Sequence, residues 1–297
     1  MSGDDAERAR WRVRLMVAPA LIVIVGLLGT GLVAALAQSL GLYGAGAGGT
    51  LTAEHYARVL ADPEFRASLA LTLWVATAST AISTALGVGL ALALRRIVTG
   101  RRVMYALLQV PLGVPHLAIA AVFLTLLAPS GWLARVAHVA GLVAGPADVP
   151  ALVYDRWGLG IILAYIAKEV PFLAVVATAL LVRLDAGHDA VARTLGASPW
   201  QRLRLVTWPL IAPGVVSAAL MVFAFVFAAF ETPFLLGRPY PAMLAVVAQQ
   251  RYLSLDLADR PAAVAFALIM TALSGLIVWA YQRGSAACAG DERPMVF

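Results

Sequence analysis

The stretch D-A-G-H-D-A-V-A-R-T-L-G-A-S-P-W-Q-R-L-R-L-V-T-W-P-L-I-A-P-G, residues 185–214, decides how the rest of the chain is interpreted. It predicts a short helix that ends at Gly196, because glycine readily adopts the backbone conformation that terminates helices. A second helix is predicted to begin at Ser198, since serine caps helix N-termini and the proline after it fits the first helical position. Trp208 then marks the entry into a long apolar segment. A plain connection does not need two capped helices, so we expect a docking surface for another protein.

Outside this stretch, the composition is that of a membrane protein. The 297 residues are 62% hydrophobic and 13% charged, with a mean hydropathy of +0.87. Soluble domains are nearer about half apolar and about a quarter charged. Six segments have the roughly 20 apolar residues that a helix needs to cross a bilayer. They are residues 15–39, 68–94, 103–128, 158–183, 208–230 and 262–282. We therefore predict an all-α polytopic membrane protein with six transmembrane helices.

The arginines predict the orientation of these spans. Lys168 is the only lysine among 22 basic residues, and fourteen of the arginines lie on one side of the predicted spans, counting Arg183 at the end of the fourth span. The segments on that side are residues 1–14, 95–102, 184–207 and 283–297. Since cytoplasmic loops are enriched in Lys and Arg, both termini are expected in the cytoplasm. The first apolar run is longer than the core of a signal peptide, so we expect it to remain as a helix.

The same stretch carries a resemblance to a known family. Residues 192–214 resemble the EAA loop of the permease subunits of bacterial binding-protein-dependent ABC importers of type I. Gly196 matches the family glycine, and Pro209 and Pro213 match its closing prolines. The chain departs from the motif at Ala190, where the family has glutamate. Asp189 lies one residue earlier, so the salt contact of the family glutamate is in question.

The resemblance implies a division of labour between subunits. In the family this loop forms a coupling helix that sits in a groove of a separate ATPase. The residues implied to contact the ATPase are Asp189, Ala192, Arg193, Gly196, Ala197, Ser198, Pro199 and Arg202. Implied partners are homodimeric cytoplasmic ATPase subunits that bind ATP and Mg²⁺, a second permease subunit of different sequence, and a periplasmic or lipid-anchored substrate-binding protein. The implied location is the bacterial inner membrane.

The resemblance also implies how the chain is divided. Its first part, residues 1–54, would hold a cytoplasmic segment, the first transmembrane helix and an outer loop. Residues 55–283 would form the permease core with five transmembrane helices, including the coupling loop 184–207. Residues 284–297 would be a cytoplasmic tail.

Enzymatic chemistry is not expected in this chain. A phosphate-binding P-loop requires Gly-Lys-[Ser/Thr], and the only lysine follows Ala167. Metal ligands would need clustered His or Cys residues. The four histidines are scattered over four regions, at His55, His116, His138 and His188. We therefore expect no cofactor and no metal, and arginines placed between spans give no reason to expect nucleic acid as a partner.

Lys168 and Glu169 are predicted to lie about ten residues inside the fourth span, near the middle of the bilayer at about 1.5 Å per residue. A charged side chain facing lipid there costs at least ~2.5 kcal/mol, so both are expected to face protein or water. Neighbouring residues are about 100° apart around a helix, so at least one charge needs a partner elsewhere. Two roles stay open: lining the translocation path or subunit interface, or fixing helix packing.

Glu231 is a further candidate for the translocation path, at the end of the fifth span. Residues 227–241 resemble permeases grouped with the spermidine and putrescine importers, and a carboxylate suits a polycation. The alternative is a contact of Glu231 with loop backbone or with Arg238. The expected cargo is a polyamine or similar small organic cation, with a sugar, a phosphonate or another anion as the alternative.

Two other classes of function compete with the importer. The first is an ion-coupled secondary transporter in which Lys168, Glu169 and Glu231 form a relay. The second is a membrane anchor for a cytoplasmic enzyme complex. A secondary transporter has no reason to build the capped helices of residues 185–207, and an anchor predicts no substrate flux in proteoliposomes that contain the assembled complex.

Overall fold

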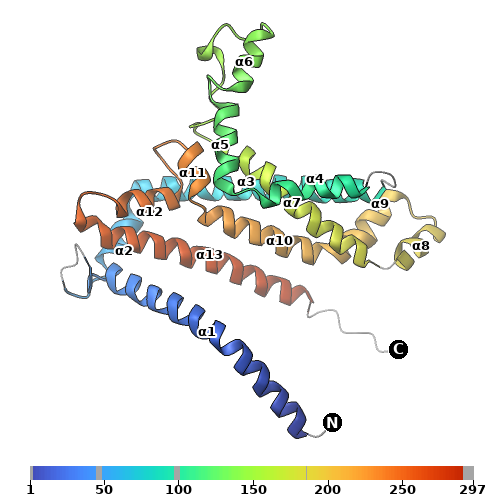
Figure 1. Ribbon diagram of the computed structural model, residues 1–297, viewed down its shortest axis with the longest axis horizontal. Helices are drawn as coiled ribbons and strands as arrows, with labels where there is room; N and C mark the ends of the chain where they lie inside the picture. The colour runs from blue at the N-terminus through green and yellow to red at the C-terminus, as the bar shows by residue number, and fades with distance from the viewer. Residues whose placement is uncertain (1–2, 45–48, 97–100, 185, 290–297) are drawn as a thin grey trace. The chain divides into compact units, whose positions relative to one another are not determined.

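The computed structural model describes residues 3–44, 49–96, 101–184 and 186–289, and the regular structure in these ranges is helical throughout. The predicted all-α class is therefore confirmed. The helices are α1 (Gly3–Ser39), α2 (Glu54–Ala61), α3 (Pro63–Arg96), α4 (Arg101–Gly113), α5 (His116–Leu127), α6 (Trp132–Val139), α7 (Leu159–Arg183), α8 (Ala186–Thr194), α9 (Pro199–Arg202), α10 (Trp208–Ala228), α11 (Glu231–Leu236), α12 (Leu244–Tyr252) and α13 (Arg260–Ala289) (Figure 1). Short 3-10 turns occupy Pro146–Asp148 and Leu257–Asp259, and Leu203–Thr207 is a π-helical turn.

Six segments of the described chain are long and apolar enough to cross a membrane, as predicted. They are Leu15–Ser39, Pro63–Arg95, His116–Val139, Leu159–Arg183, Pro199–Ala228 and Leu257–Ala280, with Val103–Gly113 as a shorter apolar helix. The prediction of one continuous helix over residues 103–128 is wrong. Helix α4 ends at Gly113 and α5 begins at His116. Pro115 explains the break, because proline has no N–H and disfavours helical geometry at the residue before it.

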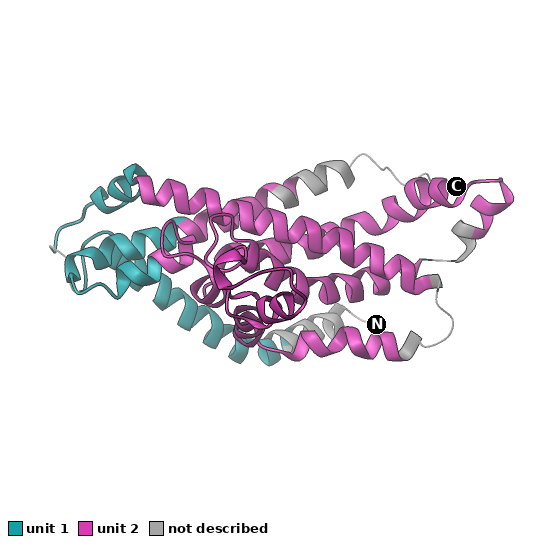
Figure 2. Cartoon of the chain, turned by 90° about the horizontal axis from the view of Figure 1, so that it is seen from above, with its two compact units in different colours: residues 1–62, 248–269 teal, residues 63–247, 270–297 magenta. Residues whose placement is uncertain are grey.

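The chain forms two compact units, shown in different colours in Figure 2. The smaller unit contains residues 1–62 and 248–269. Within it, the Ser39 and Tyr56 hydroxyls are 2.7 Å apart, and Arg251 forms an ion pair with Asp62. No residue in the most apolar stretch of α1 is buried. This stretch is therefore available for contact with lipid or with a partner. The predicted division at residues 55 and 284 stays a prediction, and residues 290–297 of the predicted tail lie outside the described chain.

The larger unit, residues 63–247 and 270–297, has its core where α3, α7 and α10 pack against one another (Figure 1). One buried apolar cluster joins these three helices, and a second joins α3 and α7 to α4. The first consists of Val88, Ala91, Ala177, Leu181, Ile211 and Val215, and the second of Leu94, Leu108 and Ala174. Small residues in these clusters let the helices approach closely, which is how membrane helices associate without a hydrophobic driving force.

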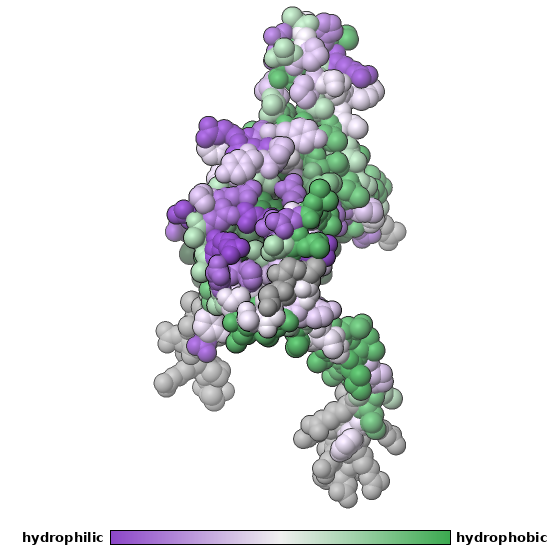
Figure 3. Space-filling view, turned by 90° about the vertical axis from the view of Figure 1, so that its left-hand side faces the viewer, coloured by the Kyte–Doolittle hydropathy of each residue, from purple (hydrophilic) through white to green (hydrophobic). Residues whose placement is uncertain are grey.

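Helices α5 and α6 project from this unit (Figure 1). Helix α5 turns away from the common direction of α3, α4 and α7, and α6 lies at its far end. The tip of the projection carries mixed hydrophilic and hydrophobic residues, and hydrophobic surface lies below it (Figure 3). Leu117 and Val122 of α5 are both about half exposed. A large apolar surface of this kind marks contact with lipid or with another subunit.

Gly87 sets the distance between α3 and α7. A methyl group on Gly87 would lie 2.8 Å from Leu173 Cβ and 3.0 Å from the Ala174 nitrogen, whereas one on Gly89 would meet nothing within 4 Å. We predict that Gly87→Ala lowers stability by ~1–3 kcal/mol, the usual cost of overpacking. The matched control Gly89→Ala should cause no loss, because alanine favours helix more than glycine does. Thermal melting of the detergent-purified variants measures both, and equal melting temperatures would contradict the close approach.

Candidate functional site

The break between α4 and α5 leaves backbone carbonyls without helical donors. The carbonyl of Pro111 would normally accept a hydrogen bond from residue 115, which is proline and has no N–H. Lys168 of α7 meets this end of α4. Its Nζ donates hydrogen bonds to the carbonyl oxygens of Pro111 at 2.6 Å, Leu112 at 3.1 Å and Val114 at 2.5 Å. The lysine therefore satisfies the polar backbone that the break exposes inside the membrane span.

Lysine suits this position better than arginine. Its ammonium carries three donors on one atom, which matches three carbonyls that converge from four consecutive residues. A guanidinium is a planar fork whose donors point in fixed directions, so it cannot direct three bonds from one point. The ammonium also sits at the C-terminus of α4, where the helix dipole favours a positive charge. Lys168 is only 6% exposed, so these contacts replace its hydration.

Glu169 contacts the other side of the same break. Its Oε1 lies 3.2 Å from Nε2 of His116, the first residue of α5, and Glu169 is 7% exposed. A carboxylate is favourable near a helix N-terminus, where the dipole is positive. The two neighbouring charges of α7 therefore bind the two helix ends that suit their signs. These contacts agree with the expectation that at least one of the charges of Lys168 and Glu169 has its partner elsewhere.

His116 is a site residue that sequence reasoning missed. Its ring packs against Phe225 with centroids 4.5 Å apart, and lies 6.4 Å from the ring of Tyr165. From the sequence, His116 was one of four scattered histidines for which no site was predicted. A signal was present, since His116 directly follows Pro115 within an apolar run, and proline inside such a run marks a helix boundary.

Glu231 is the first residue of α11, and its side chain is exposed. Helix α11 packs against α5 and α7, so it lies beside the break. The described structure thus places Lys168 and Glu169 at the α4–α5 break, with Glu231 on the neighbouring helix α11. The role of these residues in transport stays a prediction.

The predicted coupling segment contains two capped helices, as expected. Helix α8 ends at Thr194, and Gly196 closes the turn after it with a φ of +78°, in the left-handed region. The Gly196 nitrogen donates to the Arg193 carbonyl at 2.9 Å, and the Ala197 nitrogen donates to the Ala192 carbonyl at 3.0 Å. This pair of bonds is the Schellman arrangement that closes helices. Glycine is needed at this position because an L residue is strained at positive φ.

Ser198 begins the second helix with a capping box. The Gln201 nitrogen donates to the Ser198 hydroxyl at 3.3 Å, and the Ser198 nitrogen donates to the Gln201 side-chain oxygen at 2.8 Å. The sequence predicted that the next membrane span is entered at Trp208, and α10 begins at this residue. Helix α9 continues through the π turn into α10, with the Trp208 nitrogen bonded to the Leu203 carbonyl. The wider turn accommodates Pro209, which cannot donate and would crowd the carbonyl four residues earlier.

The coupling segment presents apolar residues on its surface. Leu195 is 80% exposed and Trp200 is 67% exposed. Of the predicted contact residues, Gly196, Ser198, Pro199 and Arg193 are exposed, Ala197 and Arg202 are half-buried, and Ala192 is buried. The side chain of Asp189 lies outside the described residues. Exposed tryptophan and leucine on a capped, ordered segment are typical of an interaction site.

Comparison with known proteins identifies the family. The family model described as "Binding-protein-dependent transport system inner membrane component" matches residues 83–285, which include the α4–α5 break and the coupling segment. The chain belongs to this family. The permease is therefore a multi-pass protein of the inner membrane. Membership of this family favours the importer over a secondary transporter or an anchor.

Three curated relatives of the permease have named cargoes. A probable molybdenum ABC transporter permease of Haloferax volcanii is 30% identical over 68% of this chain and 70% of that protein. The molybdenum permease ModB of Mycobacterium tuberculosis is 27% identical over 74% of this chain and 80% of that protein. The trehalose permease SugA of the same species is 29% identical over 56% of this chain, and the match spans about half of SugA, 52% of its length. None of these three names a polyamine.

The fold of the permease is that of solved ABC importers. A chain of a bacterial ABC transporter involved in the import of the acidic polysaccharide alginate matches with a TM-score of 0.78. The alignment covers 96% of the permease and 98% of that chain, at 19% identity. A second structure of that transporter, in complex with its alginate-bound periplasmic protein, matches with a TM-score of 0.77. The predicted permease fold of a type I importer is thus confirmed.

Removing the lysine should weaken the fold of the permease. Lys168→Met keeps the length of the side chain but removes the hydrogen bonds to the carbonyls of Pro111, Leu112 and Val114, at ~1–3 kcal/mol for each carbonyl left without a donor. The Pro111 carbonyl keeps the bond from the Val114 nitrogen. We predict a clearly lower melting temperature in detergent, with Leu163→Met, at an exposed position of the same helix, as the control. A Lys168→Met protein that melts like wild type would show that the break does not depend on this side chain.

Proposed function

We propose that the permease forms one half of the translocation pathway of an ATP-driven importer. The observation that carries this proposal is the coupling segment, in which Gly196 and Ser198 order two short helices that expose Leu195 and Trp200. In the proposed mechanism, ATP-driven closure of two identical cytoplasmic ATPase subunits moves residues 186–206. The transmembrane helices then alternate between inward and outward openings. The permease itself binds neither ATP nor Mg²⁺.

The proposed partners follow from the surfaces left uncovered. Residues Val191, Leu195 and Trp200 would seat the ATPase, which places α8, α9 and both termini in the cytoplasm. The apolar surface of α5 would meet a second permease subunit, proposed to be a different chain. A periplasmic or lipid-anchored binding protein would deliver the cargo. The structurally similar alginate transporter supports this, since it was solved in complex with an alginate-bound periplasmic protein.

The cargo is proposed as a small solute carried by a binding protein. The sequence favoured a polyamine, but the relatives named above transport molybdenum or trehalose, and a further relative is the thiamine permease ThiP of Escherichia coli. The molybdenum and trehalose relatives support the alternative of an anion or a sugar, whereas thiamine is itself a small organic cation; none of these relatives names a polyamine. Identifying the ligand that copurifies with the cognate binding protein distinguishes the three classes.

Lys168 and Glu169 are proposed to act on the translocation path or at the permease interface, together with Glu231. Their contacts with both ends of the α4–α5 break support this, since discontinuous helices at mid-membrane often form transport sites. In this proposal Lys168 holds the C-terminal carbonyls of α4 while Glu169 positions His116. The angle of α5 to the bundle then depends on these two side chains.

A coupling test addresses the proposed function directly. Gly196→Val forces a β-branched residue to positive φ, which costs about 1–2 kcal/mol or more, whereas asparagine tolerates this conformation. A Cβ atom on residue 196 would meet no other atom within 4 Å, so the strain comes from the backbone conformation alone. In proteoliposomes with the ATPase and the loaded binding protein, we expect Gly196→Val to lower uptake per ATP hydrolysed about tenfold, and Gly196→Asn to preserve it.

Two results of this assay would contradict the proposal. Unchanged uptake by Gly196→Val would remove the docking role of the segment. Cargo movement by the wild-type permease without ATPase subunits or nucleotide would favour the ion-coupled secondary transporter instead.

Exchange of the lysine tests the pathway role. Lys168→Arg keeps the charge but replaces a point donor by a planar one, so it should insert normally and yet transport poorly. We expect an uptake rate reduced about tenfold in the same proteoliposomes, with substrate-independent ATP hydrolysis retained. Arg66→Lys, at an exposed arginine of α3 outside the coupling segment, is the control for an arginine-lysine exchange elsewhere. Wild-type uptake by both Lys168→Arg and Lys168→Met would eliminate the proposed role.

A further inference from the structure

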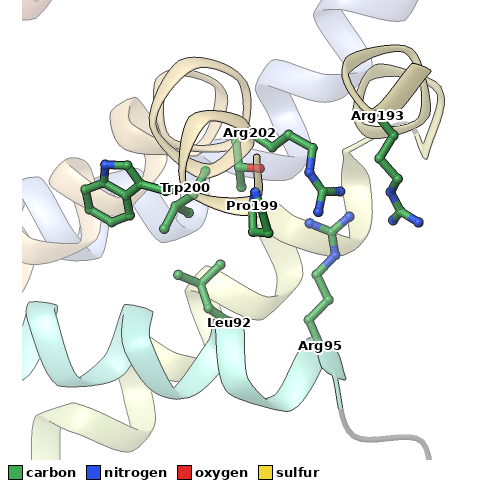
Figure 4. A pocket seen from close by; sticks show the side chains of 8 residues that line it. Leu92, Arg95, Arg193, Pro199, Trp200 and Arg202 are labelled. Carbon is green, nitrogen blue, oxygen red and sulfur yellow. The ribbon is translucent and has the colours of Figure 1, made fainter. Parts of the chain in front are cut away.

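Three arginines from three helices surround one cavity of about 480 Å³ (Figure 4). Arg95 comes from the end of α3, Arg193 from α8 and Arg202 from α9. Figure 4 shows the guanidinium groups of Arg95 and Arg202 pointing toward each other, with Arg193 on the same side of the cavity. The remaining wall is mostly apolar. It consists of Leu92, Pro199, Trp200 and Leu203, with Thr207 as a further polar residue.

The convergence of like charges points to an anionic occupant. Two guanidiniums that face each other repel, and an anion between them reverses the sign of the interaction. Arg193 and Arg202 make other contacts as well. A guanidinium has five N–H donors, so such contacts leave capacity for a ligand. Its planar fork matches the oxygens of phosphate, which it binds in bidentate fashion.

The position and size of the cavity narrow the choice of anion. The membrane-crossing segment of α3 ends at Arg95, and Leu92 lies one turn before it. The cavity is therefore at the level where the hydrocarbon of the bilayer gives way to headgroups. Its 480 Å³ exceeds the ~30 Å³ share of one water many times, so it is larger than a single carboxylate needs. An occupant with a phosphate at one end and apolar atoms at the other fits both walls.

We propose that this arginine pocket binds the phosphate headgroup of an anionic phospholipid. The phosphate lies between Arg95, Arg193 and Arg202, and the glycerol and first acyl carbons lie along Leu92 and Trp200. Basic pockets between helices at the membrane boundary bind anionic headgroups in this way. The pocket shares Arg193, Trp200 and Arg202 with the proposed coupling segment, so its link to transport rests on the proposed function, whereas lipid binding itself is measured without transport. A bound lipid would link the end of α3 to the coupling segment, two parts of the chain that are far apart in sequence.

An acidic side chain of a partner subunit would also match the charge. It does not explain the apolar wall at Leu92 and Leu203, nor the location at the end of the apolar span. The lipid is therefore the occupant that the described residues favour.

Lipid-dependent melting tests the pocket in the full-length permease. The protein in neutral detergent is titrated with dioleoyl-phosphatidylglycerol, with dioleoyl-phosphatidylcholine, or with inorganic phosphate. We expect phosphatidylglycerol to raise the melting temperature of wild type by several degrees and the other two probes to have little effect. Arg95→Gln should need about tenfold more phosphatidylglycerol for half of that rise, because it loses a charge-assisted contact. Arg204→Gln, an exposed arginine that does not line the pocket, should respond like wild type.

Other outcomes overturn the proposal. Equal responses of wild type and Arg95→Gln would place the lipid elsewhere, and equal effects of the two lipids would remove the anionic preference. A rise with inorganic phosphate alone would identify a soluble anion as the ligand. Weaker binding of purified ATPase subunits to Arg95→Gln, with an unchanged lipid response, would identify an acidic partner side chain instead. If Arg95→Gln fails to fold, Arg193→Gln provides the same comparison.

Discussion

Backbone polarity inside the bilayer is the constraint on which this molecule depends. A membrane span may not leave carbonyls without donors, since no water replaces the missing bond. Yet the chain places Pro115 between α4, which ends at Gly113, and α5, which begins at His116. Lys168 resolves the conflict by donating to three of the exposed carbonyls. The direction of α5, and the surface it offers to other subunits, follows from this arrangement.

In the coupling segment, too, the unpaired backbone groups at helix ends receive hydrogen-bond partners. There the donors and acceptors are local, because Gly196 closes α8 with its own backbone and Ser198 opens α9 with a capping box. Local completion leaves the apolar side chains of Leu195 and Trp200 available for a partner. At the α4–α5 break, completion is instead achieved by a side chain from a helix more than fifty residues away in sequence.

Much of this was readable from the sequence, and the remainder has a physical reason. Helix caps and spans depend on neighbouring residues, so Gly196, Ser198 and most span boundaries were predictable. The partners of Lys168 were not, because they are backbone atoms brought close only by tertiary packing. The role of His116 was not predicted for the same reason. The prediction of a continuous third span was wrong because a hydropathy average does not detect the single proline at which a helix ends. The continuity of α9 with α10 depends on a change of hydrogen-bond spacing that composition does not signal.

The unbroken course from Pro199 to Ala228 has a mechanical consequence. No extended residue separates α9 from α10, so a displacement applied at Trp200 is carried directly into the packed core that contains Ile211 and Val215. Helix α8 is joined to the same segment through the left-handed glycine. The continuous helical connection through α10 is therefore the one that leads from the coupling segment to the interior.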